Sequence, residues 1–202
     1  MTCLAQESGE VAQFDIYEPS DHSIETSSGL YQNYHLGRTK RYLENGLGVR
    51  FMAMYSHKTF SIGLIGGVSR NENKRDYPDN TFQFEQRIFM NVGFVWGATY
   101  SKFKYLFSYE YTGQDYRPNL DGWRFDLSGN SYGAHLVFPV HLGSYITQNI
   151  YGRLYNSISI GFFADLKYNN FDLVEASGFM MNIGFSLRTQ GFFMKKVPHP
   201  YL

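Results

Sequence analysis

The chain has 202 residues, and its 18 Lys and Arg balance its 18 Asp and Glu, so the formal net charge is zero. A neutral chain without a basic stripe lacks the electrostatic footprint of a nucleic-acid-binding protein, and we expect no nucleic-acid partner. The single cysteine excludes an intrachain disulfide framework and a cysteine-based metal site. Aromatic residues make up 18% of the chain, a surplus that suits the aromatic girdles of a membrane protein.

The first 28 residues are expected to lie outside the folded domain. Residues 1–5 look like the end of a cleaved export signal, because the small Ala5 followed by Gln6 would suit a cleavage point; an accidental match is the alternative. Residues 6–28 are polar, contain several Asp and Glu and lack a clear period, which predicts a flexible leader. We therefore divide the chain into a leader over 1–28, a domain over 29–197 and a tail over 198–202.

Alternation of apolar and polar residues dominates from residue 29 onward. The first candidate strand covers residues 30–40 and is weak, and Asn45-Gly46 is typical of tight hairpin turns. Residues 47–56 and 60–68 follow as clearer strands, with bulky apolar side chains at every second position. A charged stretch over 70–80 is then expected to form a long loop.

The strongest alternation runs from residue 82 to residue 100. Successive side chains of a strand point to opposite faces, so this segment has one apolar, largely aromatic face and one face of polar, charged and glycine residues. The chain offers almost no helix to cover the apolar face, and we predict a closed barrel whose apolar face meets lipid. The even positions that form this face read Phe82, Phe84, Gln86, Ile88, Met90, Val92, Phe94, Trp96, Ala98 and Tyr100.

A second long loop and one further hairpin follow this strand. Residues 103–111 alternate after a tight turn, and residues 112–130 are expected to form the loop, with a possible short strand at 123–127. Residues 132–141 form the next strand, and Gly143-Ser144 is expected to form a short turn.

The C-terminal part contains two more clear strands, at 157–166 and 179–188. Residues 145–153 are ambiguous, and residues 191–197 could add a short closing strand. Long loops and tight turns alternate along the chain, as in outer-membrane barrels, and the count of strands is eight to ten.

The strand pattern carries a resemblance at the level of architecture. Aromatic residues lie at strand ends, such as Trp96, Tyr100, Tyr109 and Tyr111, and glycines recur on the polar face. Over residues 29–190 the chain resembles the small bacterial outer-membrane β-barrel proteins of the OmpA/OmpX-like kind, and its tyrosine-rich strands look like exported proteins of Bacteroidota. The resemblance implies an all-β, antiparallel up-and-down transmembrane β-barrel of about eight strands, located in the bacterial outer membrane with membrane lipid as its partner. The glycines concerned are Gly63, Gly67, Gly93, Gly97, Gly133, Gly161 and Gly184.

Charged residues on the polar face are the first candidates for a functional site. If the aromatic face is outside, these side chains project into a lumen that an eight-stranded barrel leaves just wide enough to be filled by side chains. Charges in such a lumen must pair, so we interpret them as a structural network of ion pairs, with a selectivity ring or gated pore as the alternative. The predicted lumen set is Arg50, Glu85, Arg87, Lys104, Glu110, His135, Asp165 and Arg188.

Other chemistry is weakly indicated. We find no cluster of His and Ser typical of lipid-modifying barrel enzymes, no set of metal ligands and no phosphate-binding loop, so we expect neither an enzyme nor a cofactor. Tyr116, Arg117 and Trp123 of the second long loop could form a recognition surface for a protein partner, the alternative being a solvated loop.

The function favoured by these patterns is that of an outer-membrane β-barrel with a structural, adhesion or narrow-pore role. The alternatives are a soluble lipocalin-like barrel, which would turn its apolar face inward around a ligand, and a barrel enzyme that acts on lipid. The number of bulky aromatics favours the outer-membrane barrel, because so many Phe and Tyr would overfill the interior of a small soluble barrel.

Overall fold

The computed structural model describes residues 16–41, 43–71, 82–83, 88–118, 125–149, 152–171 and 177–197. Eight long antiparallel strands make up nearly all of this part of the chain. They are β1 (Ile16–His35), β2 (Gly46–His57), β3 (Phe60–Arg70), β5 (Ile88–Tyr100), β6 (Phe103–Pro118), β7 (Phe125–Asn149), β8 (Gly152–Phe171) and β9 (Gly178–Val197). The two-residue strand β4 (Phe82–Gln83) pairs with the end of β6, and a short 3-10 helix, η1 (Thr39–Arg41), follows β1. No helix in the described part of the chain is long and apolar enough to cross a membrane.

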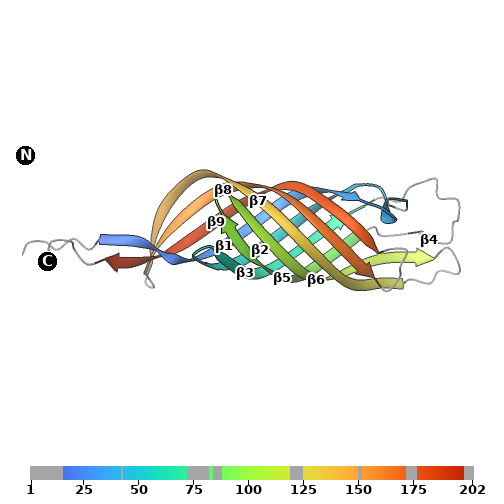
Figure 1. Cartoon of the computed structure of the whole chain (residues 1–202), viewed down its shortest axis with the longest axis horizontal. Coiled ribbons are helices and arrows are strands. Elements are labelled where there is room, and N and C mark those ends of the chain that lie inside the picture. Colours follow the sequence, from blue (N-terminus) through green and yellow to red (C-terminus); the bar gives the residue numbers. More distant parts are fainter. Residues whose placement is uncertain are drawn as a thin grey trace, which may run out of the picture.

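The eight strands form a closed up-and-down barrel (Figure 1). Each long strand pairs with the next long strand in the sequence, and β1 pairs with β9 along most of its length, which closes the ring. Closure leaves the body of the sheet without a free edge, so main-chain hydrogen bonds are satisfied within the barrel. The predicted all-β, antiparallel, eight-stranded barrel is therefore confirmed.

Side-chain orientation follows the alternation in the sequence. On β3, Ile62 and Leu64 point outward and are half exposed, whereas Ser61 points into the barrel and is buried. Glycines let neighbouring strands approach closely: a Cβ atom at Gly93 would lie 2.1 Å from the main-chain oxygen of Tyr109 on β6. Small residues thus face inward where space is short, and large apolar residues face outward.

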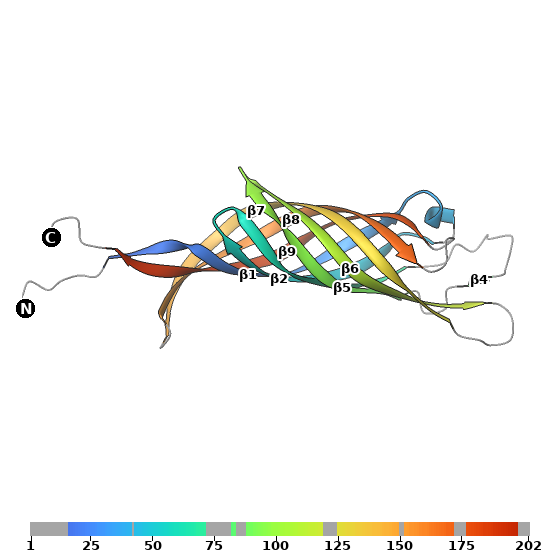
Figure 2. The ribbon, with the colours of Figure 1, turned by 60° about the horizontal axis from the view of Figure 1, so that its bottom comes forward.

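The two ends of the barrel differ in their connections (Figures 1 and 2). Lys58 and Ser101, both with left-handed backbones, form two-residue turns after β2 and β5. These turns lie at the same end as the start of β1 and the end of β9, which we call the turn end; the opposite end, where β1, β3, β6 and β8 end, is called the loop end. The β7–β8 hairpin reaches beyond the other turns, because β7 pairs with β8 as far as Asn149 but leaves β6 after Val137.

The predicted leader over residues 1–28 is wrong for residues 16–28. These residues form the first part of β1 and pair with both β2 and β9. The segment looked irregular because its inward side chains, Ser23, Glu25 and Ser27, are polar and only Ile24 among the outward ones is large and apolar. Residues 1–15 and the predicted tail over 198–202 lie outside the described residues.

Two predicted turns also differ from the structure. Asn45-Gly46 is no hairpin turn, because β1 ends at His35 and the connection to β2 contains η1. The sheet does not turn at Gly143-Ser144: a β-bulge after His141 lets β7 continue to Asn149, so the ambiguous segment belongs to the β7–β8 hairpin.

The predicted long loop over 112–130 is mostly strand. Its first residues extend β6 to Pro118, and β7 begins at Phe125. Within the predicted strand over 82–100, residues 84–87 lie outside the described part of the chain.

Candidate functional site

The barrel lumen gathers most of the predicted charged residues. Six of them are buried and point inward from β2, β6, β7, β8 and β9. Glu85 and Arg87 lie outside the described residues. The six are Arg50, Lys104, Glu110, His135, Asp165 and Arg188.

A network at mid-barrel is centred on Asp165. Nη1 of Arg50 donates to both carboxylate oxygens at 2.8 Å, and Nδ1 of His135, the cross-strand neighbour of Asp165, lies 3.0 Å from Oδ1. The Arg50 guanidinium also lies over the Phe163 ring, 3.4 Å from its centroid. The carboxylate thus lies against the guanidinium that donates to it and beside the imidazole, and the cation gains a stacking partner.

A second network lies toward the loop end and is centred on Glu110, which is 0% exposed. Nζ of Lys167 donates to its carboxylate at 2.8 Å and Oγ of Ser108 at 2.5 Å, and the Asn91 amide donates to it as well. Ser108 also lies 2.8 Å from Nε2 of His135, so the two networks form one continuous chain of polar groups across the lumen.

A third network lies toward the turn end and is centred on Glu25. Nζ of Lys104 donates to its Oε2 at 2.7 Å, and Nε and Nη2 of Arg188 donate to its Oε1 at 3.0 and 2.7 Å. One carboxylate therefore holds two cations, beside a polar cavity of about 230 Å³ that opens among the turn-end residues.

Apolar side chains fill the lumen between the turn-end and mid-barrel networks. On β6, Leu106 lies between Lys104 and Ser108; on β8, Phe163 lies next to Asp165 on the side of the turn end. The residues of this buried cluster are Tyr31, Met52, Met54, Ile65, Val95, Leu106, Val137 and Phe163. Together with the paired charges they occupy the interior, as expected for a barrel of eight strands.

Ser108, His135 and Asp165 have the spacing of a catalytic triad, an arrangement the sequence did not predict. The direction of the protons differs from that of a triad. The Ser108 hydroxyl donates to Glu110, so the imidazole Nε2 must donate to Oγ, whereas a general base accepts the serine proton. All three side chains are also buried in the packed lumen. We therefore interpret them as structural.

Two charged residues of the networks, Glu25 and Lys167, were missed from the sequence. Glu25 was assigned to the leader, although it alternates with Ile24 and Thr26 in the same way as other lumen residues. Lys167 follows Asp165 by two positions on β8 and therefore shares its face, so extending the predicted strand by one residue would have found it.

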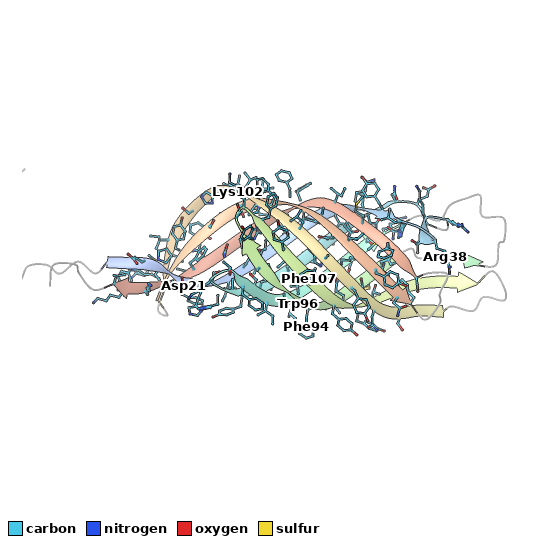
Figure 3. The ribbon with its side chains drawn as sticks, viewed as in Figure 1. Asp21, Arg38, Phe94, Trp96, Lys102 and Phe107 are labelled. Carbon is cyan, nitrogen blue, oxygen red and sulfur yellow. The ribbon has the colours of Figure 1, made fainter. Side chains whose placement is uncertain are left out.

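The predicted interface aromatics lie on the outer surface. Trp96 and Tyr100 on β5, and Tyr109 and Tyr111 on β6, are all exposed, Tyr100 to 77%. Large apolar side chains cover the outside of all eight strands; in Figure 3, Phe94, Trp96 and Phe107 lie around the middle of the barrel, and the charged Asp21, Arg38 and Lys102 lie away from it toward its ends. The exposed apolar belt includes Ile24, Leu30, Phe51, Ile62, Leu64, Val92, Phe94, Phe107, Tyr132, Leu166, Phe185 and Leu187.

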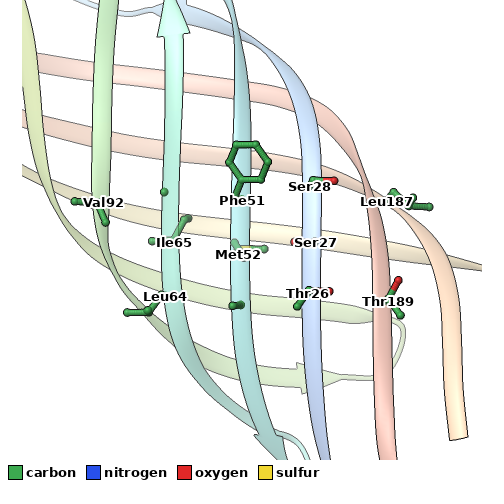
Figure 4. Close-up of a pocket in the computed structure, with 12 residues that line it drawn as sticks. Thr26, Ser27, Ser28, Phe51, Met52, Leu64, Ile65, Val92, Leu187 and Thr189 are labelled. Atoms are coloured by element: carbon green, nitrogen blue, oxygen red, sulfur yellow. The ribbon is translucent and has the colours of Figure 1, made fainter. Parts of the chain in front are cut away.

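A shallow apolar groove of about 490 Å³ interrupts this belt across β1, β2 and β3 (Figure 4). Small outward residues, Thr26, Ser28 and Ala53, lie between larger ones such as Phe51 and Leu64. The groove is open along the outer surface, so it is part of the belt and differs from the enclosed ligand cavity of a soluble barrel.

The predicted loop-recognition residues are not gathered on a loop. Tyr116 and Arg117 belong to β6, where Tyr116 is paired with Phe125 of β7 and Arg117 with Gln83 of β4. Trp123 lies outside the described residues. The loop was predicted because the polar and glycine residues around these positions hide the strand period.

Comparisons with known proteins give little further information. No protein-family model matches the chain, and no curated protein matches it significantly. The crystal structure of Neisserial surface protein A (NspA) is similar with 13% identity and a TM-score of 0.46, covering 87% of this chain and 99% of that chain. An acetoacetate decarboxylase-like enzyme from Sphingomonas wittichii RW1 has 7% identity and a TM-score of 0.14, covering 89% of this chain and 94% of that chain. TM-scores below 0.5 support no conclusion about this protein.

Proposed function

We propose that this protein is a β-barrel of the bacterial outer membrane with a structural or adhesive role and a lumen closed by its own side chains. The observation that carries the proposal is the polarity of the barrel wall. Large apolar side chains are exposed on all eight strands, whereas seven Arg, Lys, Asp and Glu side chains of the described residues are buried inside. This is the reverse of the arrangement in a water-soluble barrel.

Lipid is the environment in which this wall is stable. Soluble monomers rarely expose apolar patches larger than a few hundred Å². In a bilayer an apolar surface costs nothing to expose, and a closed barrel satisfies its main-chain hydrogen bonds internally. An even number of strands with tight turns at one end and longer connections at the other is typical of bacterial outer-membrane barrels.

The interior argues against the soluble lipocalin-like alternative. A barrel that carries an apolar ligand needs an apolar cavity, but here the lumen contains the networks around Glu25, Glu110 and Asp165. It also argues against an open pore, because Leu106 and Phe163 fill the space between the charged layers. We therefore favour a closed barrel that anchors its loop end at the cell surface.

The first test is to isolate membranes and compare unheated with boiled samples by gel electrophoresis in mild detergent. A folded barrel migrates faster before boiling, and a chain that is soluble and monomeric without detergent would contradict the proposal. Planar-bilayer recordings then test closure: we expect no steady conductance, and reproducible channel openings would overturn the closed lumen while leaving the membrane location intact.

A further inference from the structure

We propose that His22, His57 and Tyr55 form a binding site for a divalent transition-metal ion on the outer face of the barrel at its turn end. His22 on β1 and His57 on β2 are direct cross-strand neighbours. Their Nδ1 atoms lie 3.2 Å apart, and the Tyr55 hydroxyl contacts Nδ1 of His22. All three side chains are exposed, and the two histidines lie at the turn-end edge of the belt beside the exposed, charged Asp21 and Lys58, so an ion can reach them from water.

The distance between the two ring nitrogens fits a shared metal ion. Imidazole nitrogens bind such ions at about 2.0–2.1 Å, so two of them lie about 2.9 Å apart at a 90° angle and about 3.3 Å apart at a tetrahedral angle. The observed 3.2 Å falls between these values. An ion can therefore replace the hydrogen bond between the rings with little movement of either strand.

The main chain around the two histidines is held in place. The amide of Lys58, the first residue of the turn after β2, donates to the Asp21 carbonyl at 2.8 Å. The His22 amide donates to Oγ of Ser20 at 3.2 Å. These hydrogen bonds hold the main chain on which the two histidines stand. The pair is therefore positioned before an ion arrives, which lowers the entropy lost on binding.

The donor set indicates which ions bind. Two imidazoles and a phenol oxygen are N,N,O donors, which suit Cu²⁺, Ni²⁺ and Zn²⁺, and Cu²⁺ binds such sets most tightly. Among the described residues no third His, Cys, Asp or Glu joins the two histidines to form a group that could hold a metal. We therefore assign Tyr55 as the third protein ligand, and its phenol releases a proton to water on binding. Water molecules complete the coordination.

The test titrates the detergent-folded full chain with Cu²⁺ in a Cys3→Ser background, which removes the competing thiol. We expect one Cu²⁺ per chain, with electron paramagnetic resonance showing coupling to two imidazole nitrogens. H22Q and H57Q should each weaken binding at least tenfold, and the double variant should abolish it. The matched control is H141Q, another exposed turn-end histidine, whose ring bonds to Ser157.

Retained binding in the double variant, or an equal loss in H141Q, would overturn the site. The change in gel mobility on boiling is measured for each variant, because these exposed substitutions should leave the barrel folded. A folded wild-type chain that binds no Cu²⁺, or shows coupling to a single nitrogen, would equally refute the proposal and would leave His22 and His57 as a hydrogen-bonded pair.

Discussion

A charged residue in the lumen is compatible with a stable barrel only when it is paired with a residue of opposite charge. Arg50 and Asp165 are almost fully buried, and each satisfies the charge of the other. Removing one member of a buried ion pair leaves an uncompensated charge, whereas replacing both by apolar side chains of similar volume is often neutral or stabilising. The lumen charges therefore constrain one another, and their individual loss should be costly.

We expect Asp165→Asn to lower the free energy of unfolding by about 3–5 kcal/mol, because it leaves the Arg50 guanidinium without its counter-ion. Urea unfolding of the protein refolded in lipid vesicles measures this change. The control is Asp21→Asn at an exposed position, where about 0.5 kcal/mol or less is expected. Combining Asp165→Leu with Arg50→Met should recover most of the loss; equal effects of Asp165→Asn and Asp21→Asn would show that the pair is not buried in the folded barrel.

Ser108 should be chemically inert despite its place beside His135 and Asp165. Its hydroxyl proton is directed at Glu110, so the imidazole does not activate it, and no labelling by a fluorophosphonate probe is expected for the folded protein. Mass spectrometry after incubation with the probe checks this. Labelling that disappears in Ser108→Ala would identify a nucleophile and would make the chain an enzyme.

At the scale of secondary-structure elements, β5 and β6 depend on glycine at their contact. A Cβ atom at Gly93 would collide with the main chain of β6, so Gly93→Ala should lower the free energy of unfolding by about 1–3 kcal/mol. Gly143→Ala is the matched control, since nothing lies within 4 Å of a Cβ atom there and the backbone is not left-handed. Urea unfolding in vesicles compares the two, and equal stability would contradict the close approach of the strands.

Strand β1 should prove indispensable over its whole described length. Deleting residues 2–28 removes the part of β1 that pairs with both β2 and β9, so we expect no faster-migrating band on an unheated gel. Deleting residues 2–15 leaves β1 whole and should preserve that band. A folded band from the longer deletion would mean that residues 16–28 are a leader after all.

Most of the fold was predictable because lipid-facing strands repeat large apolar residues at every second position. Prediction failed where that signal is absent. The outward side chains of residues 16–28 are mostly small or polar, so the first part of β1 was assigned to a leader, and Glu25 and His22 were assigned to that leader with it. The β-bulge after His141 shifts the period by one residue, which made the long β7 look like a strand followed by a turn.

The site was predictable only in its composition. Arg50, Lys104, Glu110, Asp165 and Arg188 were placed on the inner face by alternation alone. Which of them pair depends on how far each strand is shifted relative to its neighbours around the ring, and alternation within single strands carries no information about that shift. The contact between Arg50 on β2 and Asp165 on β8 crosses the lumen and could be seen only in the closed barrel.

At the scale of the whole molecule, the belt should respond to charge according to depth. Phe94, in the middle of β5 and 62% exposed, should lose about 2–4 kcal/mol of stability on change to Arg if the belt faces a bilayer. Tyr100→Arg at the turn end is the control, with an expected cost of about 0–1 kcal/mol. Urea titration in vesicles measures both, and two equally small costs would place the belt in water.

The pairing of β1 with β9 also dictates when this molecule can form. Strand β1 has no final partner on one side until β9 has been synthesised, and Ile16 pairs with Val197. Contacts this distant in sequence form slowly, and until they do the growing chain has two open strand edges and an uncovered apolar belt. Completion is therefore a single late event for the whole chain, and the nascent polypeptide must be shielded from its own copies until the ring closes.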